Sequence, residues 1–110
     1  MTIAVKEYLD PAGRSPYARW FHGLHAPAAA KVATALYRLA LGNLSNVKSV
    51  GAGVYECKID FGPGYRVYFG REGERDIILL GGSDKRRQQA AIAAAKVTWA
   101  VYKRIRPEIK

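Results

Sequence analysis

The chain has 110 residues, enough for one domain with a single hydrophobic core and too few for two. Hydrophobic residues make up 49% and charged residues 25%, which excludes a disordered chain, and no apolar run approaches the roughly 20 residues that cross a bilayer. The net charge of +9 excludes an acidic protein and favours a polyanionic partner. We therefore expect residues 1–110 to form a single domain.

Few residues are suited to metal or redox chemistry. Cys57 is the only cysteine, which excludes an internal disulfide and a cysteine-based zinc site. His22 and His25 stand three apart without a third ligand nearby in the sequence, so we expect no metal and no cofactor. The N-terminal segment lacks the basic and apolar regions of a signal peptide. We expect a cytoplasmic protein that does not bind a membrane.

The first part of the chain predicts one strand and two helices. Residues 2–9 alternate in the manner of a strand. Ser15, followed by proline, is a typical helix start, and Gly23 marks the end of that short helix. A second helix is expected from Pro27 to the glycine at Gly42. The pattern predicts two antiparallel helices joined by a tight turn.

Two later segments, residues 54–61 and 65–69, have a hydrophobic period of two and predict a β-hairpin. A hairpin centred near Pro63 places Lys58 opposite Tyr68 and Asp60 opposite Arg66. One face of this hairpin is then apolar. The opposite face carries Glu56, Lys58, Asp60, Arg66 and Tyr68. We expect helices to cover the apolar face and the polar face to stay open.

The remaining segments predict one loop, one strand and one helix. Residues 43–53 show no regular pattern, whereas residues 76–82 are apolar at successive positions, as in a strand near the middle of a sheet. A last helix is expected from Ser83 or Asp84 to about Ile105. The sequence predicts an α+β domain with a mainly antiparallel four-stranded sheet, an N-terminal helical hairpin and a C-terminal helix, in the order β-α-α-β-β-β-α.

A cluster of cations, Lys85, Arg86 and Arg87, falls in the first turn of the last predicted helix. The helix dipole disfavours cations there by roughly 0.3 to 1 kcal/mol each. Helix N-terminal amides attract phosphate, so the cluster indicates an anion site. The alternative is a solvated face that keeps the protein in solution.

The polar hairpin face also allows two interpretations. Lys58 and Arg66 could pair with Glu56 and Asp60 as ordinary cross-strand ion pairs. They could instead form a basic groove for RNA, with Tyr68 as a surface on which a base stacks.

The motifs of several enzyme classes are missing. The chain has no paired-carboxylate constellation, no P-loop and no nucleophile elbow. An enzyme built on this sequence must work with cations and a tyrosine, for which Tyr102 is a candidate. RNA cleavage fits, because the substrate supplies its own 2′-hydroxyl nucleophile and the protein needs only to orient it, stabilise the phosphorane and move protons.

Three stretches of sequence carry a family resemblance. They are SPYARWFHGL, LGNLSNVKSVGAGVYECKIDFGPGYRVYFGREGE, and IILLGGSDKRRQQAAIAAAK before WAVYK. From about Arg14 to Lys103 the chain resembles the RelE/ParE superfamily of toxins, in particular its HigB-like "addiction module killer protein" branch. The resemblance implies a small sheet flanked by helices. It also implies the toxin of a type II toxin–antitoxin system, a metal-independent endoribonuclease that cuts mRNA in the ribosomal A site.

The resemblance also implies site residues. Lys58 takes the place of the arginine in the family's Glu-Leu-Arg motif, Arg66 that of the arginine in Gly-Tyr-Arg-Val, and Lys85 that of the lysine in DKxxQ. Arg66 and Lys58 are then expected on the scissile phosphate, with Lys85 as phosphate binder or proton donor. The expected RNA-binding residues are Lys48, Tyr68, Arg86, Arg87 and Gln88.

The sequence departs from the family pattern at three places. Cys57 and Lys58 replace Leu-Arg, and lysine lacks the bidentate fork that suits a phosphate. Ser83 is inserted before the DKxxQ motif, and Ala91 replaces an aspartate.

The implied partners are the ribosome, mRNA and a cognate antitoxin with a helix-turn-helix fold encoded next door, with operator DNA reached only through that antitoxin. Two alternatives stay open. The first is a ParE-like inhibitor of DNA gyrase, against which the presence of Lys58, Arg66 and Lys85 together argues. The second is an inactive toxin homologue that serves only as an antitoxin-bound co-repressor, which the departures would allow.

Overall fold

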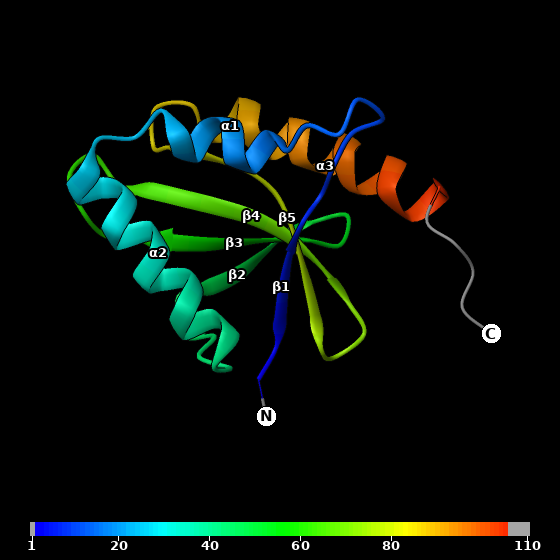
Figure 1. Ribbon diagram of the computed structural model, residues 1–110, viewed down its shortest axis with the longest axis horizontal. Coiled ribbons are helices and arrows are strands. Elements are labelled where there is room, and N and C mark those ends of the chain that lie inside the picture. The colour runs from blue at the N-terminus through cyan, green and yellow to red at the C-terminus, as the bar shows by residue number, and fades with distance from the viewer. Residues whose placement is uncertain (1, 106–110) are drawn as a thin grey trace.

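The structure is a computed structural model that describes residues 2–105 as an α+β fold with helices on both faces of one sheet (Figure 1). Its elements are β1 (Ala4–Glu7), α1 (Pro16–His22), α2 (Ala26–Ala40), β2 (Val47–Gly51), β3 (Val54–Ile59), β4 (Tyr65–Glu72), β5 (Asp76–Asp84) and α3 (Gln88–Ile105). The five strands lie in the order β1-β5-β4-β3-β2. The β1–β5 pair is parallel and the others are antiparallel, so the sheet is mixed.

The predicted fold class is confirmed, whereas the predicted four-stranded sheet and element order are wrong. The segment expected to be a loop contains β2, which pairs with β3 through Val47 opposite Cys57 and Ser49 opposite Tyr55. Because β2 is an edge strand, it buries little surface, and a register shift after Ser49 interrupts its alternation. The order is β-α-α-β-β-β-β-α.

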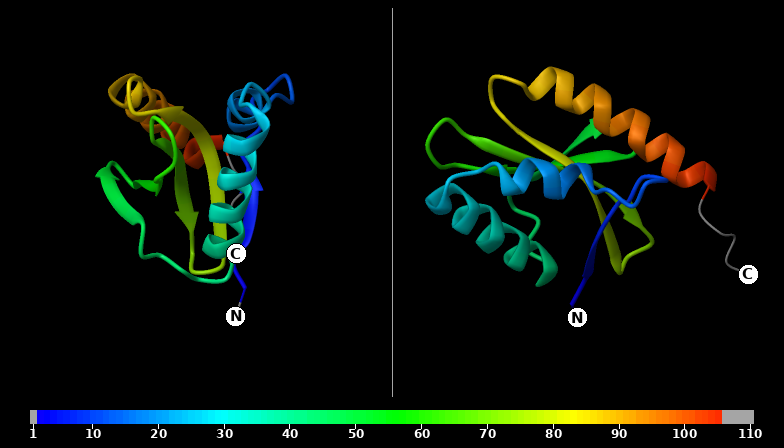
Figure 2. Two further views of the ribbon diagram at one scale, coloured as in Figure 1. Left: turned by 90° about the vertical axis from the view of Figure 1, so that its left-hand side faces the viewer. Right: turned by 45° about the horizontal axis from the view of Figure 1, so that its top comes forward.

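The predicted starts of the first two helices are confirmed. The Ser15 hydroxyl accepts a hydrogen bond from the Ala18 amide at 3.0 Å, and α1 ends before Gly23. The two helices do not form a packed antiparallel hairpin, because α1 packs on β5 whereas α2 packs on β3 and β1. Figure 2 shows α1 and α2 running in clearly different directions. Within residues 2–105 no helix combines the length and apolar composition needed to cross a membrane.

The first core lies between the sheet and the pair α1 and α2. It comprises Tyr17, Ala28, Val32, Leu39, Cys57, Ile59, Tyr65, Val67, Phe69, Ile77 and Leu79. The β3 and β4 residues of this core belong to the hairpin face that the sequence predicts to be apolar and covered by helices, so this prediction is confirmed. Trp20 of α1 packs directly over Gly82, where the absence of a side chain leaves room for the indole.

The second core lies under α3, on the face that was expected to stay open. It comprises Tyr8, Val54, Tyr68, Ile78, Leu80, Ala95 and Trp99. The prediction of an open polar face is therefore wrong for the part of the sheet that α3 covers. The cause is β5, which is buried on both faces and so needs a helix on each side, as expected of the interior strand that the sequence predicts.

The β3–β4 hairpin is centred on Gly62 rather than on Pro63. Lys58 lies opposite Arg66, and Glu56 lies opposite Tyr68, whereas the predicted register placed Lys58 opposite Tyr68. The five-residue connection 60–64 uses two left-handed glycines, Gly62 at φ 55° and Gly64 at φ 85°. Each β3 residue thus faces a β4 residue two positions from the predicted one. Because side chains alternate between the two faces of a strand, this shift leaves every side chain on its predicted face. Asp60 lies in the loop, so its predicted pairing with Arg66 is wrong.

Candidate functional site

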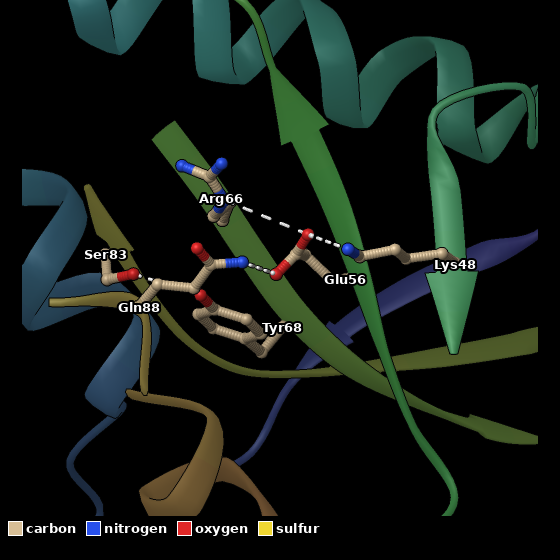
Figure 3. Close-up of polar contacts among 6 residues, drawn as sticks. All are labelled: Lys48, Glu56, Arg66, Tyr68, Ser83 and Gln88. Atoms are coloured by element: carbon tan, nitrogen blue, oxygen red, sulfur yellow. Dashed lines mark hydrogen bonds and ion pairs between the residues drawn. The ribbon is translucent and has the colours of Figure 1, made fainter. Parts of the chain in front are cut away.

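A cluster of polar side chains lies on the α3 face of the sheet, near the start of α3 (Figure 3). The side chains of Glu56 in β3 and Arg66 in β4 are buried, with 2% and 7% of their surface exposed. Arg66 Nε and Glu56 Oε2 are 3.8 Å apart, an ion pair that is too long for a hydrogen bond. A buried charge pair of this kind needs further partners to offset the loss of hydration.

Glu56 connects four elements of the fold. Its Oε1 accepts a hydrogen bond of 2.9 Å from Gln88 Nε2 at the start of α3. Its Oε2 also lies 3.9 Å from Nζ of Lys48, which projects from β2 and is largely exposed. Figure 3 shows Glu56 lying among Lys48, Arg66 and Gln88. The ion pair of Arg66 with Glu56 is one that the sequence allowed as an alternative to an RNA groove, whereas the burial of Glu56 and its hydrogen bond to Gln88 were not predicted.

Arg66 retains unused hydrogen-bonding capacity. Its Nε and Nη1 atoms are buried and have no hydrogen-bond partner within the described part of the chain. A buried donor without a partner costs roughly 1–3 kcal/mol, and more when it belongs to a charged group. The guanidinium offers a planar fork that suits a phosphate or a carboxylate. Arg66 is therefore a buried cation with two unsatisfied donors, which an anionic ligand reaches only when neighbouring side chains move.

The other two predicted catalytic residues lie near Arg66. Lys58 is directly opposite Arg66 on the neighbouring strand and is exposed. The Lys85 amide donates a 3.0 Å hydrogen bond to the Gly64 carbonyl, which ties the β5–α3 connection to the β3–β4 turn. A Cβ placed on Gly64 would lie 3.4 Å from Arg66 Nη1 and 4.0 Å from Lys85 Cβ. The structure therefore brings Lys58, Arg66 and Lys85 to one end of the sheet.

The cation cluster does not begin a helix. Strand β5 extends to Asp84 and α3 starts at Gln88, so the predicted start of the last helix is wrong and the cations lie in the turn between these elements. The helix-dipole argument for an anion site at these residues therefore does not hold. Asp84 Oδ1 accepts the Arg87 amide at 3.1 Å, which explains why the segment resembles a helix cap in sequence.

The three cations of this turn point to two different surfaces. Lys85 and Arg86 line a shallow hollow beside Pro63, on the side of the β3–β4 turn. Arg87 instead lines a groove of about 600 Å³ between α1 and α3, together with Arg19. All three cations are exposed, so they are accessible to a polyanion.

Tyr68 cannot serve as a stacking surface, so that prediction is wrong. Its side chain is fully buried beneath α3, and its hydroxyl lies 3.1 Å from the Ser83 hydroxyl in a hydrogen bond. Burial raises the pKa of the Tyr68 hydroxyl, with the Ser83 hydrogen bond acting in the opposite direction. Gln88 is partly buried and its side-chain amide donates a hydrogen bond to Glu56, so Gln88 positions the Glu56 carboxylate.

Tyr102 lies away from the cluster. Its hydroxyl donates a 3.0 Å hydrogen bond to Glu72 at the far end of β4. Glu72 is six positions from Arg66 along this strand, a distance of roughly 20 Å at the rise of a β-strand. Tyr102 is therefore placed for packing against Trp99 and Tyr8, not for chemistry at Arg66.

Cys57 is buried in the first core, and its titration predicts a loss of stability in alkali. Burial, reinforced by the charge of Glu56, raises the pKa of the thiol from 9.0 to about 11. Above pH 9 the unfolded chain loses this proton while the folded chain keeps it. The thiol's contribution to stability is thus complete below pH 9 and is lost as pH rises through 11.

We expect the free energy of unfolding to fall by up to about 1.4 kcal/mol per pH unit between pH 9 and 11 because of Cys57. Urea titrations at a series of pH values measure this slope. A Cys57→Val variant should lose it, while Tyr17, whose pKa burial raises to about 12, contributes equally to both proteins. Equal slopes in the two proteins would contradict the assignment.

Comparison with known proteins identifies a relative of this chain. A curated protein of Haemophilus influenzae, described there as an "Uncharacterized protein", is 38% identical over 98 residues, which cover 88% of this chain and 93% of that protein. No family model matches the chain.

Proposed function

We propose that this chain, which belongs to the same protein family as the Haemophilus influenzae protein, is the toxin of a type II toxin–antitoxin system and cleaves mRNA on the ribosome. The observation that carries the proposal is the buried Arg66 guanidinium, whose Nε and Nη1 have no hydrogen-bond partner in the described chain. The resemblance of the hairpin and DKxxQ segments to RelE/ParE toxins supports the same reading from the sequence.

Arg66 is the anchor for the scissile phosphate in this proposal. A phosphate oxygen can accept from a guanidinium through charge-assisted hydrogen bonds, which are about twice as strong as neutral ones. Lys58 on the adjacent strand and Lys85 at the turn add positive charge on either side of Arg66. Donors that are already fixed in place stabilise the extra negative charge of a phosphorane more than they stabilise the ground state.

The reaction needs no nucleophile from the protein. The ribose 2′-oxygen attacks the adjacent phosphorus and releases its proton to solvent water, and the bond between phosphorus and the 5′-oxygen breaks. Lys85 donates a proton to the departing 5′-oxygen. The products are a 2′,3′-cyclic phosphate, or a 3′-phosphate after its hydrolysis, and a 5′-hydroxyl end. The main task of the protein is to hold this in-line geometry.

Exposed cations dock the protein on ribosomal RNA and mRNA. Lys48, Arg86 and Arg87 are all exposed, Arg86 beside the β3–β4 turn and Arg87 in the groove between α1 and α3. Each phosphate contact releases counterions, so binding should weaken steeply as salt rises. A cognate antitoxin encoded next door, with a helix-turn-helix fold that also reaches operator DNA, would cover this basic surface and suppress cleavage.

Induced expression in a bacterial host tests the proposal against its two alternatives. We expect growth arrest with fragmented mRNA and unchanged plasmid supercoiling. Arrest with intact mRNA and relaxed or broken DNA would instead identify a gyrase inhibitor. Unimpaired growth, together with operator binding that requires the antitoxin, would identify a co-repressor.

A further inference from the structure

We propose that Glu56 is an internal counter-ion that competes with the anionic ligand of Arg66, so that the free site is electrically compensated and binds phosphate weakly. The inference rests on the proposed function, because it takes Arg66 to be the phosphate anchor. It adds that Glu56, a carboxylate that does not contact the reacting atoms, weakens phosphate binding at that site.

The geometry favours compensation over a tight structural ion pair. Glu56 Oε2 stands 3.8 Å from Arg66 Nε, close enough for strong attraction and too far for a hydrogen bond. The hydrogen-bond capacity of Glu56 goes instead to Gln88, at 2.9 Å. Arg66 therefore has its charge offset while its Nε and Nη1 donors stay unused. Both atoms are buried, so a phosphate reaches them only when neighbouring side chains move, but neither atom has a hydrogen bond that must first be broken.

The same carboxylate opposes the bound ligand. A phosphate on the Arg66 guanidinium lies within several ångströms of Glu56, whose side chain is only 2% exposed and so is poorly screened. Repulsion between the phosphate and Glu56 therefore offsets part of the attraction between the phosphate and Arg66. Such a site discriminates against isolated phosphates and depends on Lys58, Lys85 and the surrounding cations to hold an RNA chain. Weak binding at the centre also favours release of the cleaved end.

Gln88 fixes the position of this counter-ion. The residue begins α3, and its amide holds one carboxylate oxygen while Lys48 approaches the other at 3.9 Å. The Lys48 side chain is 68% exposed, so it is the member of this cluster most free to turn from Glu56 to a nucleic acid. The charge felt by the ligand thus depends on contacts made by β2 and α3.

A Glu56→Gln substitution tests the proposal with inorganic pyrophosphate as the probe. The amide keeps the shape and can still accept from Gln88 while the negative charge is lost. We expect the dissociation constant for pyrophosphate, obtained from the rise in melting temperature with ligand concentration, to fall about tenfold. The exposed Glu74→Gln variant is the matched control for net charge and should change affinity by less than twofold.

The gain must depend on Arg66. Combining Glu56→Gln with Arg66→Met should abolish pyrophosphate binding. If the role of Glu56 is purely structural, the single variant Glu56→Gln should show no gain in affinity for pyrophosphate. If Glu56→Gln does not fold, Gln88→Lys offers a second route, because its cation neutralises Glu56 from the α3 side. Gln88→Lys should then tighten pyrophosphate binding more than Gln89→Lys, which adds the same charge at an exposed neighbouring position.

The outcomes separate this inference from the proposed function. Wild-type binding that is lost in Arg66→Met but unchanged in Glu56→Gln would overturn the counter-ion and leave the phosphate anchor standing. Absence of pyrophosphate binding in both wild type and Glu56→Gln would overturn the anchor, and the proposed function with it. A tenfold gain without mRNA cleavage on ribosomes would support the counter-ion and contradict the nuclease.

Discussion

Replacement of Arg66 by methionine is expected to slow mRNA cleavage on programmed ribosomes by about 10² to 10³-fold. The guanidinium supplies fixed, charge-assisted donors that a phosphorane needs more than the ground-state phosphodiester does. Methionine retains much of the volume of the side chain and removes every donor. The measurement is the single-turnover rate of appearance of the cleaved fragment at saturating protein.

A control for folding is needed because Arg66 is buried beside Glu56. Removing only the arginine leaves the buried Glu56 carboxylate with the exposed Lys48 and Gln88 as its remaining partners. We expect this change to destabilise the protein by roughly 3–5 kcal/mol. The double variant Glu56→Gln with Arg66→Met removes both charges and should recover part of this loss. It should cleave as slowly as Arg66→Met. Cleavage at the wild-type rate in a folded double variant would exclude Arg66 as the anchor.

A Gly82→Ala substitution is expected to be among the most damaging single changes to the fold. A Cβ at this position would lie 2.2–2.5 Å from three ring atoms of Trp20, far inside contact distance. The indole is rigid and α1 packs mainly on β5, so relief requires a shift of the whole helix. Overpacking of this kind costs about 1–3 kcal/mol and more where backbone must move, so we expect a loss of about 3 kcal/mol or more.

The neighbouring Gly81 supplies a matched control in the same strand. A Cβ there meets nothing within 4 Å, so Gly81→Ala should be neutral or stabilise by about 0.5 kcal/mol through a less flexible unfolded chain. Urea unfolding of both variants beside wild type measures the difference. Trp20→Phe combined with Gly82→Ala should restore part of the stability, because the two positions share one space. Equal midpoints for the two alanine variants would refute the close approach.

Sequence patterns predicted the elements whose signals are local. The start of α1 followed from Ser15, and the faces of β3 and β4 followed from alternation, since each depends on neighbouring residues. Strand β2 was missed because an edge strand buries few side chains and needs no apolar alternation. The late start of α3 was missed because Ser83 and Asp84 are good caps in isolation. Only tertiary pairing with β4 extends β5 through them.

The candidate site was predictable in composition more than in arrangement. Alternation placed Lys58 and Arg66 on one face, and the pairing of their strands brings them opposite each other. The burial of Tyr68 and Glu56 was not predictable, because it depends on α3, which comes from a segment twenty residues or more away and covers part of that face. Burial converts the same residues from an open polar surface into a compensated charge cluster.

The most direct test of the central claim is primer extension on a reporter mRNA after brief induction, with and without a translation inhibitor, for wild type beside Arg66→Ala. We expect codon-phased cuts that require both translation and Arg66. Growth arrest with an intact reporter, or cuts that persist in Arg66→Ala or without translation, would contradict it.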